Sequence, residues 1–77
     1  MSLREDIWEH LPEHVTDLKV DRRDIKGLKV INLVVNYRDP ADKAWFLDIN
    51  FAEKNKMTAA EMAANINSRL KFETAEV

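Results

Sequence analysis

Two apolar segments joined by a short turn constrain the fold of this chain more than any other feature. Residues 28–37 are rich in β-branched side chains, and residues 45–51 alternate along the chain between two faces. Both patterns are typical of β-strands. Asp39-Pro40-Ala41-Asp42 between them has the composition of a turn. The two segments therefore predict an antiparallel hairpin.

The length of the connecting loop fixes how the two strands pair, because directly opposed residues share a face of the sheet. A four-residue loop, 39–42, would place Leu33 opposite Asp48. A five-residue loop, 39–43, brings only apolar residues together: Tyr37 with Trp45, Val35 with Leu47, Leu33 with Ile49, and Ile31 with Phe51. We expect the five-residue loop, with these eight residues forming the core face.

A third strand and two helices complete the predicted fold. Residues 15–20 favour a strand, joined to the next one by a charged loop over residues 21–27, where Gly27 provides a positive φ. Thr58 and Glu61 form a capping-box pattern, which predicts a helix over residues 59–71. Ser2 and Glu5 repeat that pattern at the start of the chain, and Pro12 limits this first helix to about His10.

The predicted fold class is therefore α+β: helix, three-stranded antiparallel meander, helix, with both helices on one face of the sheet. Residues 1–77 form one domain, in which residues 73–77 are expected to fray. A chain of 77 residues without cysteine has a thin core and no disulfide to reinforce it. Small domains of this kind often complete their core by oligomerising, so we expect self-association and a homodimer in particular.

The face of the sheet opposite the core is mixed in character, and this leaves two interpretations. It is either a solvated face with a few apolar residues or a contact surface with apolar anchors and a polar rim. Phe46 is the strongest candidate anchor, because aromatic residues dominate binding hot spots. An unpaired edge strand offers a second way to bind a partner. The candidate contact residues are Val30, Asn32, Val34, Phe46, Asp48 and Asn50.

Candidate chemistry is weak along the whole chain. The segment from His10 to His14 matches the H-x-x-E-H signature of inverted zinc peptidases, but Pro12 stands between the two histidines where the helix should end. Asp39 and Asp42 have the positions of turn residues. The sequence contains no glycine-rich phosphate loop and no cysteine nucleophile. We therefore predict no catalytic residue, no metal site and no cofactor.

The predicted order of elements resembles that of the double-stranded-RNA-binding domain. Lys54 and Lys56 just before the last helix, and Ala63-Ala64 within it, also resemble residues of that family. In that family the start of the second helix carries a lysine-rich phosphate clamp, and the loop between the first two strands enters a minor groove. The resemblance implies RNA contacts by Arg22, Arg23, Lys54 and Lys56. The chain departs from the family in residues 21–27, which lack its Gly-Pro-x-His signature, and the likeness is mainly one of topology.

The sequence thus favours a non-enzymatic protein-interaction domain, such as a small regulator, inhibitor or assembly factor, with a protein partner. An RNA-binding domain is the alternative. The net charge of −2 gives no overall attraction to nucleic acid or to an anionic membrane. The absence of a long apolar segment, of a signal peptide and of cysteine predicts a cytoplasmic protein without a membrane anchor.

Overall fold

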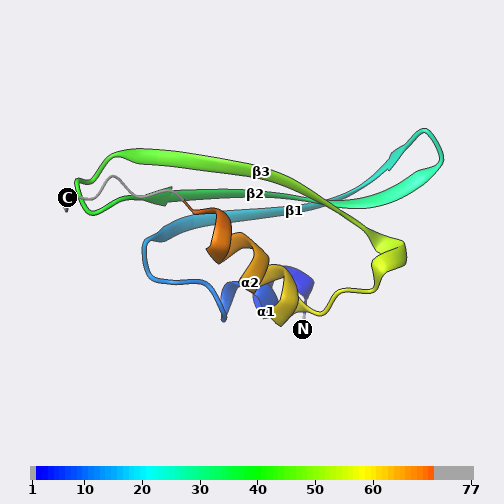
Figure 1. Cartoon of the computed structure of the whole chain (residues 1–77), viewed down its shortest axis with the longest axis horizontal. Coiled ribbons are helices and arrows are strands. Elements are labelled where there is room, and N and C mark those ends of the chain that lie inside the picture. The colour runs from blue at the N-terminus through cyan, green and yellow to red at the C-terminus, as the bar shows by residue number, and fades with distance from the viewer. Residues whose placement is uncertain (1, 71–77) are drawn as a thin grey trace.

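The structure is a computed structural model that describes residues 2–70. Its elements follow the order helix, three strands, helix: α1 (Leu3–Trp8), β1 (Val15–Ile25), β2 (Leu28–Arg38), β3 (Ala44–Ala52) and α2 (Ala59–Arg69). A short 3₁₀ helix, η1 (Glu53–Asn55), follows β3. The strands form one antiparallel sheet in the order β1-β2-β3, and both helices lie on the same side of it (Figure 1). The predicted fold class is confirmed.

The register between β2 and β3 is the one predicted from the five-residue loop. Tyr37 lies opposite Trp45, and Leu33 lies opposite Ile49. The β2 row of the core face is buried throughout, and Ile49 and Phe51 of β3 are buried with it. Ile7 of α1 and the α2 face carrying Met62, Ala63 and Ile66 close over this row. Trp45 and Leu47 are half-buried at the border of the core.

Asp39 holds the turn that sets this register. The side chain is buried, and its Oδ1 accepts hydrogen bonds from the backbone N–H groups of Ala41 and Lys43, each at 2.9 Å. Its Oδ2 accepts a third bond, at 2.9 Å, from Nε1 of Trp45. The carboxylate therefore ties the turn to the first residues of β3, while Asp42 takes the left-handed conformation with φ of 66°.

The prediction of a seven-residue loop over residues 21–27 was wrong. β1 continues to Ile25, and only Lys26 and Gly27 form the turn to β2. Both residues have positive φ, 53° and 85°, which is the pattern of a two-residue type I′ hairpin turn. The Asp24 carboxylate supports the turn by accepting a bond from the Gly27 N–H at 2.9 Å. The positive φ predicted for Gly27 is confirmed.

The helices have the predicted caps. The side chains of Ser2 and Thr58 accept from the backbone N–H groups of Glu5 and Glu61, and both glutamates return the bond. α1 ends at Trp8 rather than at His10, and its last turn tightens, with the His10 N–H donating to Ile7. α2 ends at Arg69. The predicted end at Lys71 and the predicted frayed tail over residues 73–77 lie outside the described residues.

We expect Asp39→Asn to destabilise the fold by about 1–3 kcal/mol, because its amide would present N–H donors where Oδ2 now accepts from Trp45. Asp42→Asn is the matched control: it lies in the same turn, tolerates positive φ, and should change stability by less than about 0.5 kcal/mol. Urea unfolding followed by tryptophan fluorescence measures both variants. Equal stability of the two would contradict the role given to Asp39.

A candidate contact site at the edge of β3

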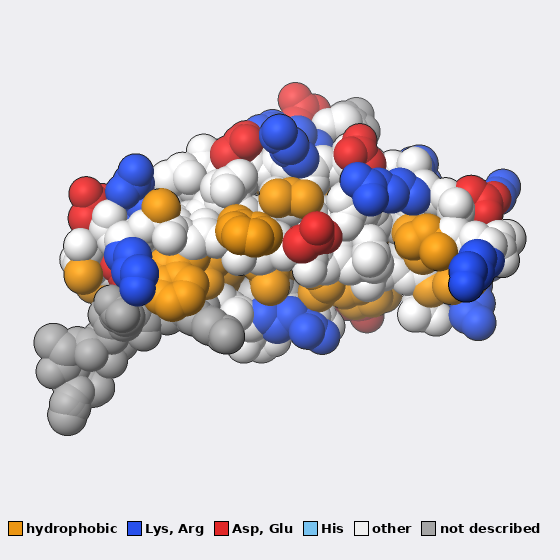
Figure 2. All heavy atoms as spheres, turned by 90° about the horizontal axis from the view of Figure 1, so that it is seen from above, with side chains coloured by type: hydrophobic (Ala, Val, Ile, Leu, Met, Phe, Trp, Pro, Cys, Tyr) orange, Lys and Arg blue, Asp and Glu red, His pale blue; other side chains and the backbone are white. Residues whose placement is uncertain are grey.

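The open face of the sheet, on the side away from the helices, carries all six predicted contact residues. The register aligns Asn32 with Asn50, Val34 with Asp48, and Asn36 with Phe46. Figure 2 looks at the molecule from the side opposite the helices and shows hydrophobic side chains in separate small groups, with charged and uncharged polar surface between them. This face therefore lacks one continuous apolar patch.

A hydrogen-bonded amide forms the centre of the open face. Nδ2 of Asn32 donates to Oδ1 of Asp48 at 2.7 Å and to Oδ1 of Asn50 at 2.9 Å. Asn32 itself is only 3% exposed. A buried amide costs stability unless its polar groups are paired, and here two side chains of β3 pair with it. The central strand and the edge strand are thus linked by side chains as well as by their backbones.

The six predicted contact residues differ strongly in accessibility. Val30 is 5% exposed, so the expectation that it is an accessible anchor was wrong. It lies on the central strand between Arg23 and Ala52, and a side chain with neighbours on both sides loses most of its contact with water. Asn32 is buried for the same reason and Val34 is half-buried. Asp48 and Asn50 are exposed, and Phe46 is 70% exposed.

The backbone of β3 presents alternate peptide groups to its outer edge. The Asp39 N–H donates to the Lys43 carbonyl at 3.0 Å, which makes these two residues a hydrogen-bonded pair. Pairs alternate along an antiparallel ladder, so Trp45, Leu47, Ile49 and Phe51 direct their backbone groups toward β2. The intervening residues direct theirs outward. Within residues 2–70, no hydrogen bond reaches the outward groups of Ala44, Phe46, Asp48 and Asn50, whereas the Ala52 carbonyl begins η1.

The opposite edge of the sheet, along β1, is protected in three ways. Nε of Arg4 donates to the Leu18 carbonyl at 2.7 Å, so α1 covers part of this edge. A bulge between Val15 and Asp17 interrupts the strand. Residues 21–24 are all charged. Bulges, charges and covering segments are the usual means by which proteins prevent edge-to-edge pairing.

The β3 edge has none of these protections among the described residues. Asp48 is its one charged residue between Ala44 and Ala52, and the strand contains neither lysine nor proline. α1 packs chiefly on α2 and β1. An apolar, regular and uncovered edge with a largely exposed phenylalanine is therefore the strongest candidate contact site.

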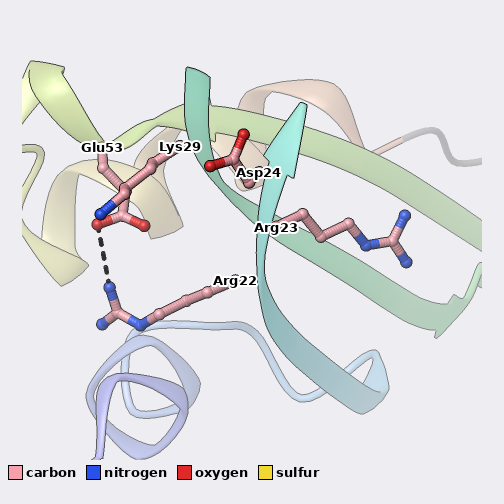
Figure 3. Close-up of a pocket in the computed structure, with 5 residues that line it drawn as sticks. All are labelled: Arg22, Arg23, Asp24, Lys29 and Glu53. Carbon is pink, nitrogen blue, oxygen red and sulfur yellow. Dashed lines mark hydrogen bonds and ion pairs between the residues drawn. The ribbon is translucent and has the colours of Figure 1, made fainter. Parts of the chain in front are cut away.

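Three of the four basic residues of the RNA alternative, Arg22, Arg23 and Lys56, line two adjoining hollows, and Lys54 lies in η1. Arg22 and Arg23 point to opposite faces of the sheet, as Figure 3 shows. Nη1 of Arg22 lies 3.3 Å from Oε1 of Glu53, inside an open hollow of about 360 Å³ that is also lined by Arg23, Asp24 and Lys29. Lys56 lines a neighbouring hollow with Arg22 and Glu53. The basic groups near η1 therefore share their surroundings with a carboxylate.

The histidine motif is not presented on a helix. α1 ends at Trp8, and both His10 and His14 are exposed in the segment that leads to β1. Two histidines separated by one helical turn would be needed to bind zinc in the way the motif implies. Within residues 2–70 there is no group of three or more histidine, aspartate or glutamate side chains placed to hold a metal ion.

Sequence reasoning missed one exposed apolar pair, at the tip of the β1–β2 hairpin. Ile25 and Leu28 lie opposite each other on the open face and are 46% and 44% exposed. Ile25 was assigned to a loop, and the signal that could have placed it is the two-residue spacing to Leu28 across Lys26-Gly27. The pair lies at the far end of the hairpin, beyond the last residue of β3 (Figure 1).

Comparison with known proteins gives no relative, since no protein-family model, curated protein or solved structure matches the chain. In the part of the chain that the structure describes, neither helix has the length and apolar character needed to cross a membrane. The case for the candidate site therefore comes from the geometry of the sheet and not from a known relative.

We expect Asn32→Asp to destabilise the fold by about 1–3 kcal/mol at neutral pH, because a carboxylate would replace the donor that Asp48 and Asn50 now share. Protonation of the introduced carboxylate would remove the repulsion and restore a donor, so the loss should shrink as the pH falls toward about 4. The double variant Asn32→Asp/Asp48→Asn restores a donor and should recover most of the stability. Urea unfolding across this pH range tests it, and a loss independent of Asp48 would contradict the network.

Proposed function

We propose that the chain is a non-enzymatic protein-interaction domain that binds its partner through the outer edge of β3. The observation that carries the proposal is the contrast between the two edges of one small sheet. β1 is bulged, charged and bonded by Arg4, whereas β3 is apolar and no other part of residues 2–70 covers its outer edge. An edge of the second kind is the usual acceptor of an added strand, in which main-chain bonds provide affinity and side chains provide specificity.

Phe46 gives this edge a side-chain anchor. Its backbone groups point outward from β3, and its ring is the most exposed of the large apolar side chains in residues 2–70. A partner strand added along β3 would cover one side of the ring. Aromatic residues at such positions commonly supply a large share of binding energy.

The proposal includes a non-catalytic role in the cytoplasm, as a regulator, inhibitor or assembly factor. The hollow beside Glu53 is open and lined by charged residues, and the Glu53 carboxylate pairs with Arg22. This arrangement supports a solvated surface rather than a substrate cleft. A chain without cysteine also needs no oxidising compartment to fold.

RNA binding stays the alternative prediction. If Arg22, Arg23, Lys54 and Lys56 contact phosphates, duplex RNA will bind at low salt, and the affinity will fall steeply as the salt concentration rises. A fluorescence anisotropy titration at several salt concentrations measures this. The double variant Arg22→Gln/Lys56→Gln is the control, and we expect the natural chain to bind duplex RNA no more tightly than this variant does. A steeply salt-dependent affinity that the double variant lacks would favour RNA over a protein partner.

We expect Phe46→Asp to weaken protein association about 30-fold, which corresponds to the roughly 2 kcal/mol of a typical hot spot. The circular dichroism spectrum and the unfolding midpoint should change little, because the side chain is already mostly in water. Leu28→Asp is the matched control, since Leu28 is an exposed apolar residue on the same face but beyond the end of β3. Association that is unchanged by Phe46→Asp, or equally weakened by Leu28→Asp, would contradict the proposal.

A further inference from the structure

We infer that the partner at the β3 edge is a second copy of this chain, paired antiparallel to β3 about a two-fold axis at Ile49. The inference rests on the proposed contact function and specifies its occupant. Such a pair would join two three-stranded sheets into one continuous sheet, with the helices of both copies on the same side.

The sequence of β3 is complementary to itself in this register. On the open face, Phe46 comes to lie opposite Ala52 of the second copy, and Asp48 opposite Asn50 of the second copy. On the helix-side face, Leu47 lies opposite Phe51, and the two Ile49 residues meet at the axis. Each residue therefore meets one of its own polarity, as is favoured in cross-strand pairs.

Neighbouring registers are less complementary. A pair centred on Asp48 would place two carboxylates directly opposite each other, which is destabilising. A pair centred on Leu47 would set Phe46 against Asp48, and one centred on Phe46 would set Ala44 against Asp48. A pair centred on Asn50 would set Asp48 against Ala52 and leave Phe46 with no β3 residue opposite it. The register centred on Ile49 is the one that avoids all of these contacts.

The polar network around Asn32 leaves one donor and one acceptor available for the contacts that this register needs. Asn50 uses its Oδ1 to accept from Asn32, and Asp48 also accepts from Asn32 through Oδ1. Nδ2 of Asn50 and Oδ2 of Asp48 make no hydrogen bond with any described residue. The two-fold axis creates two such contacts, in each of which Nδ2 of Asn50 donates to the Asp48 carboxylate of the other copy. Hydrogen bonds to a charged acceptor are among the stronger ones.

The backbone and the core also fit this arrangement. Phe46, Asp48 and Asn50 direct their peptide groups outward, so Asp48 and Asn50 form the central hydrogen-bonded pairs of the new ladder. After Ala52 the chain turns away from this edge, since Glu53 reaches Arg22 of β1. Leu47, half-buried in one copy, would lie beside Phe51 of the other, which enlarges a thin core.

Single-cysteine variants test the axis, because the natural chain has no cysteine. Under oxidation, a single cysteine can link two copies only where a residue meets itself. The two Cα atoms of such a non-hydrogen-bonded pair are about 4.5 Å apart, within disulfide range. Ile49→Cys should therefore give a linked dimer of about 18 kDa, twice the 9.0 kDa of one chain. Preferential linkage of Phe46→Cys, Leu47→Cys or Asp48→Cys would overturn the register.

A charge exchange tests the same register without altering the core. Asn50→Asp keeps an acceptor for Asn32 but sets carboxylates against Asp48 of the second copy, so the dimer should weaken at least tenfold at low salt and less at high salt. The exchanged variant Asp48→Asn/Asn50→Asp restores one amide and one carboxylate in each pair and should dimerise like the natural chain. Sedimentation equilibrium measures all three. A natural chain that stays monomeric at 100 µM, or an exchange that fails to restore the dimer, would overturn the inference.

A photo-crosslinking experiment separates this inference from the proposed function. Phe46 is replaced by p-benzoyl-phenylalanine, and the full chain is irradiated in the cells that express it. An adduct of about 18 kDa formed by two copies supports the inference, since it has twice the 9.0 kDa mass. An adduct with a different protein overturns the inference and leaves the proposed function standing. The absence of any adduct overturns both.

Discussion

The pairing of β2 with β3 is the constraint on which the rest of this structure depends. A shift of one residue would exchange the two faces of β3, moving Phe46 into the core and Ile49 into water. The five-residue turn sets the register, and the buried carboxylate of Asp39 holds that turn through three donors. The same register brings Asn32 to Asp48 and Asn50 and decides which peptide groups of β3 point outward. Core, open face and edge are therefore consequences of one alignment.

The two edges of the sheet show how unevenly a small domain can be protected. At β1, a single arginine from α1 occupies an outward carbonyl, and a bulge and a run of charges prevent regular pairing. At β3, the outward groups lie on a regular strand with one charge. A three-stranded sheet always has two edges, and closing or covering both requires additional chain. A 77-residue domain that protects one edge and keeps the other regular is suited to pairing through the second.

Much of this fold was accessible from the sequence, and the failures have physical causes. The β2–β3 register was predictable because eight apolar residues match in only one loop length. The extent of β1 was not predictable, because residues 21–24 are charged on both faces and Lys26-Gly27 is an uncommon sequence for a type I′ turn. The burial of Val30 depends on neighbours from two other strands, which alternation along one strand cannot reveal. The Arg4 bond to Leu18 and the Asn32 network likewise join residues distant in sequence, so the choice between the two edges emerged only from the structure.

Amide hydrogen exchange along β3 tests the pairing of two β3 strands, because it observes the outward peptide groups themselves. We expect the Asp48 and Asn50 amides to exchange slowly in concentrated protein and quickly on dilution, while Ala44, beyond the paired segment, exchanges quickly throughout. Leu47 and Ile49, bonded to β2, should stay protected at every concentration. Exchange at Asp48 and Asn50 that is fast at all concentrations, or slow without dependence on concentration, would contradict this pairing.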